Sequence, residues 1–226
     1  MEIRRASTGV KGLDERIGGG LPAPGVILVA GEPGTGKTTL CMQYLFRGAR
    51  LGETGIYVTA ISEPVDQIHR YMAGYSFYDR RLVEEGRVKF LDISEVLMKQ
   101  GARKALDMTL SFIRRSDARR VVIDSITPFS YTFSAPQEYR RFLHEFFTVL
   151  KAMETLTLIV AEFSPEEART SPESYMADGV IYLYLQRGET PSTFKPGLQV
   201  RKLKGTEHPK DILRLGFTRD GIRVLE

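Results

Sequence analysis

An eight-residue segment near the N-terminus has the composition of a phosphate-binding loop. Residues 31–38 read GEPGTGKT, which matches the pattern G-x-x-x-x-G-K-[ST]. Small glycines let the backbone wrap around a phosphate so that successive N–H groups point inward. The lysine brings a positive charge to the β- and γ-phosphates, and the last hydroxyl is placed to bind Mg²⁺. We therefore expect a nucleoside triphosphate to be held by Glu32, Pro33, Gly34, Thr35, Gly36, Lys37, Thr38 and Thr39.

A carboxylate at the end of a later apolar run is the second element with chemical potential. Asp124 follows Val121-Val122-Ile123 directly. An aspartate at the carboxyl end of a buried strand can hold Mg²⁺, often through water. In isolation such a residue would more often cap a helix or lie in a loop, but a phosphate loop in the same chain favours the metal role. We predict Thr38 and Asp124 as the residues that bind Mg²⁺.

The elements that must position these residues alternate between strands and helices. Short apolar runs predict buried parallel strands at 26–30, 55–59, 88–91, 121–124 and 156–161. Apolar residues at helical spacing predict helices at 37–51, 64–72, 102–116 and 136–153. After Gly179 only strands follow, at 180–186, 197–204, 212–217 and 222–225. The pattern predicts one α/β domain over residues 1–226, with a mostly parallel sheet flanked by helices and a C-terminal antiparallel extension.

The composition excludes several classes of protein. A hydrophobic content of 42% and a charged content of 27% are ordinary for one globular domain of 226 residues. The single cysteine, Cys41, forbids an intrachain disulfide and favours the cytoplasm. No apolar run reaches the about 18 residues that cross a bilayer, so we expect no membrane insertion. Basic pairs such as Arg119-Arg120 are scattered, and we interpret them as solvated helix faces and salt-bridged ends.

Further motifs, taken together with the phosphate loop, carry a family resemblance. They are STGVKGLD at residues 7–14, GGGLP at 18–22, Gln43 in the first helix, ADGVI at 177–181 and KLKGTEH at 202–208. This combination resembles the RecA/KaiC-like ATPases over nearly the whole chain. The resemblance implies a RecA-like P-loop NTPase fold, ATP as the nucleotide, and a hexamer or related ring with ATP between subunits.

The resemblance also implies that Lys202 and Lys204 reach the γ-phosphate bound by a neighbouring subunit. Spacing alone says only that both side chains lie on one face of a strand, as ordinary surface lysines would. The family usually has arginine at the second basic position, where this chain has Lys204. Because lysine cannot form the bidentate contact of arginine, we expect weaker stabilisation of the transition state.

The segment after the second strand departs from the family pattern. The family usually places paired glutamates there, one of which is the general base for the attacking water. This chain reads TAISEP at 59–64, so ungapped alignment puts Ile61 and Ser62 at the paired positions. A shift of one residue leaves Glu63, which we predict to be catalytic with Lys37, Lys202 and Lys204. Glu63 alternatively caps the following helix. Glu162 occupies the usual place of a γ-phosphate sensor and receives no assigned role.

These features support one leading hypothesis and two alternatives. The leading hypothesis is a slow, Mg²⁺-dependent, oligomeric ATPase that acts as a conformational switch on an unidentified regulatory protein partner. The first alternative is a DNA-binding recombination ATPase. It is less favoured because its candidate DNA loops, 127–137 and 164–172, carry almost no basic residues. The second alternative is a binding module that holds ATP without hydrolysing it.

Overall fold

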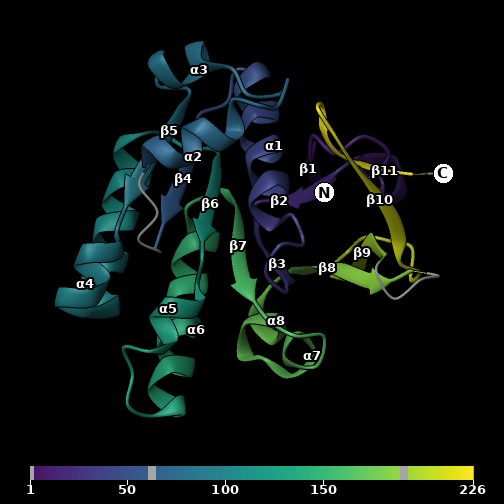
Figure 1. Cartoon of the computed structure of the whole chain (residues 1–226). Coiled ribbons are helices and arrows are strands. Elements are labelled where there is room, and N and C mark those ends of the chain that lie inside the picture. The colour runs from purple at the N-terminus through teal and green to yellow at the C-terminus, as the bar shows by residue number, and fades with distance from the viewer. Residues whose placement is uncertain (1–2, 61–64, 189–192, 226) are drawn as a thin grey trace.

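A central sheet of nine strands organises the computed structural model, which describes residues 3–60, 65–188 and 193–225 (Figure 1). In spatial order the strands are β11 (Gly221–Val224), β10 (Leu213–Thr218), β9 (Phe194–Leu203), β8 (Gly179–Arg187), β3 (Gly25–Gly31), β7 (Leu156–Glu162), β6 (Arg120–Asp124), β4 (Gly55–Thr59) and β5 (Val88–Asp92). From β8 to β5 all neighbours are parallel, whereas β9, β10 and β11 pair antiparallel. The predicted fold class is confirmed.

Helices cover both faces of this sheet and give it two separate cores. On one face, α1 (Lys37–Arg50) packs against the side chains of Ile27, Val29 and Val122. The opposite face is covered by α4 (Ser94–Arg115) and α6 (Pro136–Ala152) (Figure 1). The remaining helices are short: α2 (Val65–Met72), α3 (Arg80–Glu84), α5 (Thr127–Ser130), α7 (Glu167–Thr170) and α8 (Pro172–Met176). No described helix combines the length and apolar character that crossing a membrane requires.

The structure also contains elements that the sequence patterns did not predict. A small antiparallel pair, β1 (Arg4–Ala6) and β2 (Leu21–Ala23), encloses the 3-10 helix η1 (Asp14–Ile17). Helix α4 begins at Ser94, eight residues before the predicted start, but it is kinked at Gly101, which has non-helical angles. The predicted helix 102–116 corresponds to the part of α4 after this kink. The predicted strand 197–204 also ends earlier than expected, so that Lys204 lies just beyond β9.

Arg120 differs from the expectation that the basic pairs lie on solvated helix faces, because it is a buried residue of a strand. Its side chain is 2% exposed and stacks over the ring of Tyr44. The guanidinium donates to the carbonyl oxygens of Ser7 and Tyr44, at 2.6 and 2.8 Å, and pairs with the carboxylate of Glu53. Arg120 opens β6, so these contacts hold that strand against α1 and thereby set the position of Asp124, the last residue of β6, relative to the start of α1.

Candidate nucleotide-binding site

The predicted phosphate loop connects β3, which ends at Gly31, with α1, which begins at Lys37. Gly34 and Gly36 have φ angles of 79° and 96°, in the left-handed region that favours glycine. A Cβ atom on Gly36 would also lie 2.6 Å from the ring of Phe217 in β10. The loop therefore needs glycine at this position for two reasons, and β10 closes one side of it.

Lys37 is folded back onto the loop that precedes it. Its ammonium group donates hydrogen bonds to the carbonyl oxygens of Gly31 and Glu32, at 2.8 and 2.9 Å. Burial lowers the pKa of Lys37, and the charges of Glu162 and Asp124 act in the opposite direction. An incoming phosphate offers stronger acceptors than these carbonyls, because charge-assisted hydrogen bonds exceed neutral ones. The arrangement thus holds a cation ready at the place where a phosphate would bind.

Thr38 and Asp124 lie together, although 86 residues separate them in the sequence. The Thr38 hydroxyl donates to Oδ2 of Asp124 at 2.9 Å, and the Tyr57 hydroxyl donates to the same atom at 2.6 Å. Burial raises the pKa of Asp124, while these two hydrogen bonds act to lower it. A hydroxyl and a carboxylate are the oxygen ligands that suit Mg²⁺. The residues predicted to bind the metal therefore fit that ion.

The other predicted loop residues differ in their surroundings. Thr35 is fully buried and its hydroxyl donates to the carbonyl oxygen of Glu32 at 2.8 Å. Glu32, Pro33 and Gly34 are exposed, whereas Thr39 is buried in the first turn of α1. Glu63 lies outside the residues that the structure describes. We call the loop residues 31–39, together with Tyr57 and Asp124, the phosphate-loop half of the site.

The remaining predicted residues, Lys202 and Lys204, belong to a different cluster. The ammonium group of Lys202 donates to the carbonyl oxygens of Ser174 and Tyr175, at 3.1 and 2.9 Å. Lys204 donates to Oδ1 of Asp178 at 3.0 Å, and a third lysine, Lys151, donates to the same atom at 2.9 Å. A hollow of about 460 Å³ lies beside these lysines. We call Lys151, Asp178, Lys202 and Lys204 the lysine half.

The two halves lie at opposite ends of the parallel strands. The backbone N–H of Asp178 donates to the carbonyl oxygen of Val26 near the start of β3, and the backbone N–H of Lys204 donates to the carbonyl oxygen of Asp178. The phosphate loop follows Gly31 at the other end of β3. Five residues of strand span roughly 17 Å. Lys204 therefore cannot reach a phosphate held by the loop of its own chain.

Four residues at or near the phosphate loop were missed or received no role from the sequence patterns. Tyr57 and Phe217 touch Asp124 and Gly36 through the pairing of distant strands, which no local pattern reveals. Gln43 was noted only for its resemblance. Its amide exchanges two hydrogen bonds with the backbone of Ile222 and so fixes the β10–β11 hairpin beside α1. Glu162, which had no assigned role, ends β7 beside the loop.

Comparisons with known proteins show which family the chain resembles over its whole length. Residues 6–226 match the family model described as the KaiC ATPase. A UPF0273 protein of Pyrococcus furiosus is 30% identical, covering 98% of this chain and 94% of its own length. The circadian clock oscillator protein KaiC of Prochlorococcus marinus is 32% identical. The match covers 99% of this chain and 45% of that protein. The crystal structure of a KaiC-like protein from Pyrococcus horikoshii superposes with a TM-score of 0.85, 29% identity and full coverage of both chains.

Proposed function

The chain belongs to the KaiC family of ATPases, and from this premise we propose that it is a slow, Mg²⁺-dependent ATPase acting as an oligomeric conformational switch. ATP is held by the phosphate-loop half of one subunit. The lysine half of a neighbouring subunit contacts its γ-phosphate. Binding and hydrolysis then change how the subunits join, and with it the surface offered to a regulatory protein partner.

The single observation that carries this proposal is the separation of the two halves within one chain. A lysine cluster at one end of the strands and a phosphate loop at the other cannot meet in a monomer. A second copy arranged head to tail would bring them together, in a heterologous contact that closes into a ring if the rotation fits. Each nucleotide site in such a ring takes one half from each of two subunits.

The chemistry available in the two halves supports slow turnover. Positioning and electrostatic stabilisation supply most of the catalysis in phosphoryl transfer. Lys37 and the pair Thr38 and Asp124 fit the binding of the triphosphate and its metal. Lys204 offers a point charge in place of the planar fork of an arginine. The sequence predicts that Glu63 activates the attacking water, and this role stays a prediction.

Native mass spectrometry with and without MgATP tests the proposal. We expect ATP to convert the chain into a closed oligomer with one nucleotide per subunit, and ADP to accumulate in it over many minutes. A monomer in both conditions would contradict the shared site, and rapid hydrolysis without a partner would contradict the slow switch. An oligomer that retains only ATP would identify the chain as a binding module without hydrolysis.

A further inference from the structure

Glu162 occupies a position between the two parts of the phosphate-loop half. It is the last residue of β7, the strand that lies between β3 and β6. Its register partner in β3 is Gly31, the first residue of the loop, and the preceding part of β7 pairs with the strand that ends at Asp124. The carboxyl ends of β3, β7 and β6 lie at the same edge of the sheet. Glu162 therefore lies between the start of the phosphate loop and Asp124.

The backbone of Glu162 is fixed while its carboxylate is left available. Its N–H donates to the hydroxyl of Thr127 at 3.2 Å, which ties the end of β7 to α5. The side chain is exposed, and among the described residues no hydrogen bond or ion pair engages its carboxylate. Its position opposite Gly31 brings the charge close enough to the site to act on Lys37 and Asp124, and it raises the pKa of both groups.

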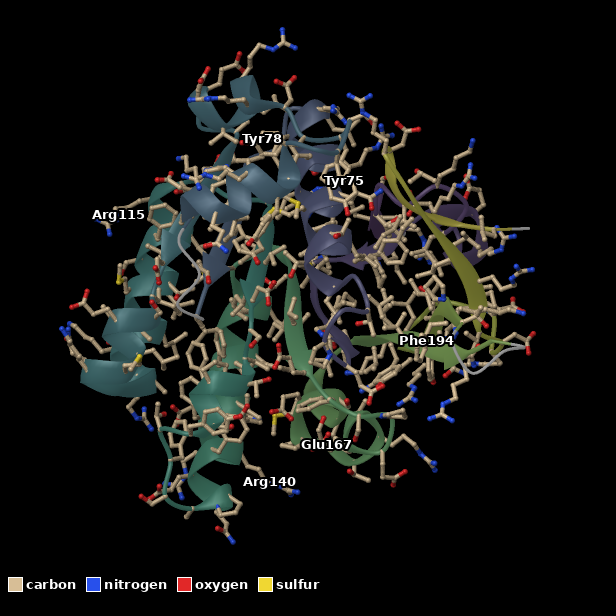
Figure 2. All side chains as sticks on the ribbon, viewed as in Figure 1. Tyr75, Tyr78, Arg115, Arg140, Glu167 and Phe194 are labelled. Atoms are coloured by element: carbon tan, nitrogen blue, oxygen red, sulfur yellow. The ribbon has the colours of Figure 1, made fainter. Side chains whose placement is uncertain are left out.

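The next acidic residues along the chain behave differently. Glu167, on α7 (Figure 2), accepts a hydrogen bond from the backbone N–H of Ser164 at 2.8 Å and so closes the turn that leads into this short helix. Glu166 lies 3.6 Å from Arg169 in an exposed ion pair. Both carboxylates serve local contacts away from the loop. Glu162 differs from them because its carboxylate has no such local contact among the described residues and its strand ends opposite Gly31, where its charge acts on the buried Lys37 and Asp124.

We propose that Glu162 is a catalytic residue that positions the attacking water and accepts its proton. This inference rests on the proposed ATPase function and gives Glu162 the role that sequence analysis gave to Glu63. The water oxygen forms a bond to the γ-phosphorus while the bond to the β,γ-bridging oxygen breaks. That oxygen leaves on ADP with the electron pair, the proton of the water passes to the Glu162 carboxylate, and inorganic phosphate is released. The nearby charge of Lys37 offsets the repulsion between this carboxylate and the phosphates.

The proposal predicts opposite effects of one substitution on binding and on hydrolysis. Glu162→Gln keeps the shape of the side chain but removes its charge and its ability to take a proton. Release of phosphate should fall about 100-fold, the usual worth of a general base. The affinity for a non-hydrolysable ATP analogue should stay equal or rise, since a negative charge beside the triphosphate is gone. A residue that only supported the loop would lose binding and hydrolysis together.

The experiment compares single-turnover phosphate release and calorimetric binding of the analogue in four proteins: wild type, Glu162→Gln, Glu166→Gln and Glu63→Gln. Glu166→Gln is the matched control and should behave like wild type. Thermal melts confirm that each variant is folded, as we expect for an exposed position. The proposal holds if Glu162→Gln alone separates binding from hydrolysis, or does so more strongly than Glu63→Gln.

Other results overturn the assignment in distinguishable ways. Normal hydrolysis by Glu162→Gln, or hydrolysis lost only in Glu63→Gln, would contradict the role of Glu162 and leave the ATPase proposal intact. Joint loss of binding and hydrolysis in Glu162→Gln would identify a structural residue. Wild type that binds the analogue but releases no phosphate from ATP would contradict the ATPase proposal, and this inference with it.

Discussion

The two halves of the proposed site differ in how their charges are held. In the phosphate-loop half, Lys37 and Asp124 are buried, 7% and 5% exposed, and are fixed by the loop carbonyls, Thr38 and Tyr57. In the lysine half, Lys151 and Lys204 are partly exposed and share the single carboxylate of Asp178. The charged groups of the phosphate-loop half are therefore held in place before any ligand binds. The lysines of the lysine half are held only by exposed contacts with their own chain, which a ligand can replace.

This difference indicates which half can respond to a partner. The buried charges have few alternatives, because moving them would leave unpaired groups in a low-dielectric interior. Exposed ion pairs contribute little free energy, so a lysine can leave Asp178 for a phosphate at small cost. We therefore expect binding to depend on the phosphate-loop half, and assembly and turnover to depend on the lysine half. The following substitutions test that division.

The largest effect is expected for Lys37→Ala. Removing the buried ammonium deletes the cation that we propose to contact the β- and γ-phosphates, so the affinity for MgATP should fall about 100-fold, the worth of hydrogen bonds to a charged group. Isothermal titration calorimetry measures this directly. Lys104→Ala, an exposed lysine on α4, serves as the control and should bind like wild type. Retained affinity in Lys37→Ala would place the triphosphate elsewhere.

Lys204→Ala should produce the opposite pattern, with a somewhat smaller effect. Its ammonium lies far from the loop of its own chain, so binding of MgATP to the isolated subunit should be unchanged. Turnover in the assembled oligomer should fall about 30-fold, because one charge that stabilises the transition state is lost. Steady-state phosphate release, corrected for oligomer content by light scattering, gives the comparison. Weakened binding with normal turnover would reverse the proposed division.

Asp178→Asn removes the carboxylate charge that pairs with Lys151 and Lys204 in the lysine half. Burial acts to raise the pKa of Asp178, but hydrogen bonds from Lys151 and Lys204 hold it below the ordinary value. The charged carboxylate therefore stabilises the fold at neutral pH, and this contribution is lost as pH falls through the lowered pKa. We expect Asp178→Asn to melt about 2–4 °C below wild type at pH 7. Melts at decreasing pH should show the difference disappear, and a constant difference would contradict the assignment.

The smallest effect, and one of opposite sign, is expected for Asp124→Asn without nucleotide. Burial raises the pKa of Asp124 in the folded chain, so its charged form costs stability at neutral pH. The variant should melt about 1–2 °C above wild type at pH 7, as is common where a functional charge is removed. Because wild type regains this stability as pH falls through the raised pKa, the gain should shrink in acid. A lower melting temperature for the variant would show that Asp124 serves the fold.

Local patterns predicted most of this fold because its buried parallel strands are uninterrupted apolar runs. The phosphate loop and Asp124 were also readable, since each follows such a run. Contacts between distant segments were not. Arg120 has the local surroundings of a surface arginine, and its burial depends on the segments that carry Ser7, Tyr44 and Glu53. The position of Glu162 beside the loop likewise follows from the order of the strands, which alternating elements alone do not determine.

Short elements escaped prediction for a related physical reason. The strands β1 and β2 have three residues each, too few for a pattern to appear. Asp14, part of the motif that carries the resemblance, accepts hydrogen bonds from the hydroxyls of Ser7 and Thr8, both at 2.6 Å. That motif therefore closes a local turn. The hydrogen bonds of this motif thus have a structural role in the fold.

The central claim is that each nucleotide site is shared by two copies of the chain, and mixing two impaired variants tests it most directly. Lys37→Ala retains an intact lysine half, and Lys204→Ala retains an intact phosphate-loop half. After the two are mixed in equal amounts with MgATP, about a quarter of randomly formed heterologous interfaces combine both intact halves. We predict phosphate release at about that fraction of the wild-type rate. A mixture no more active than the average of its two components would contradict the shared site.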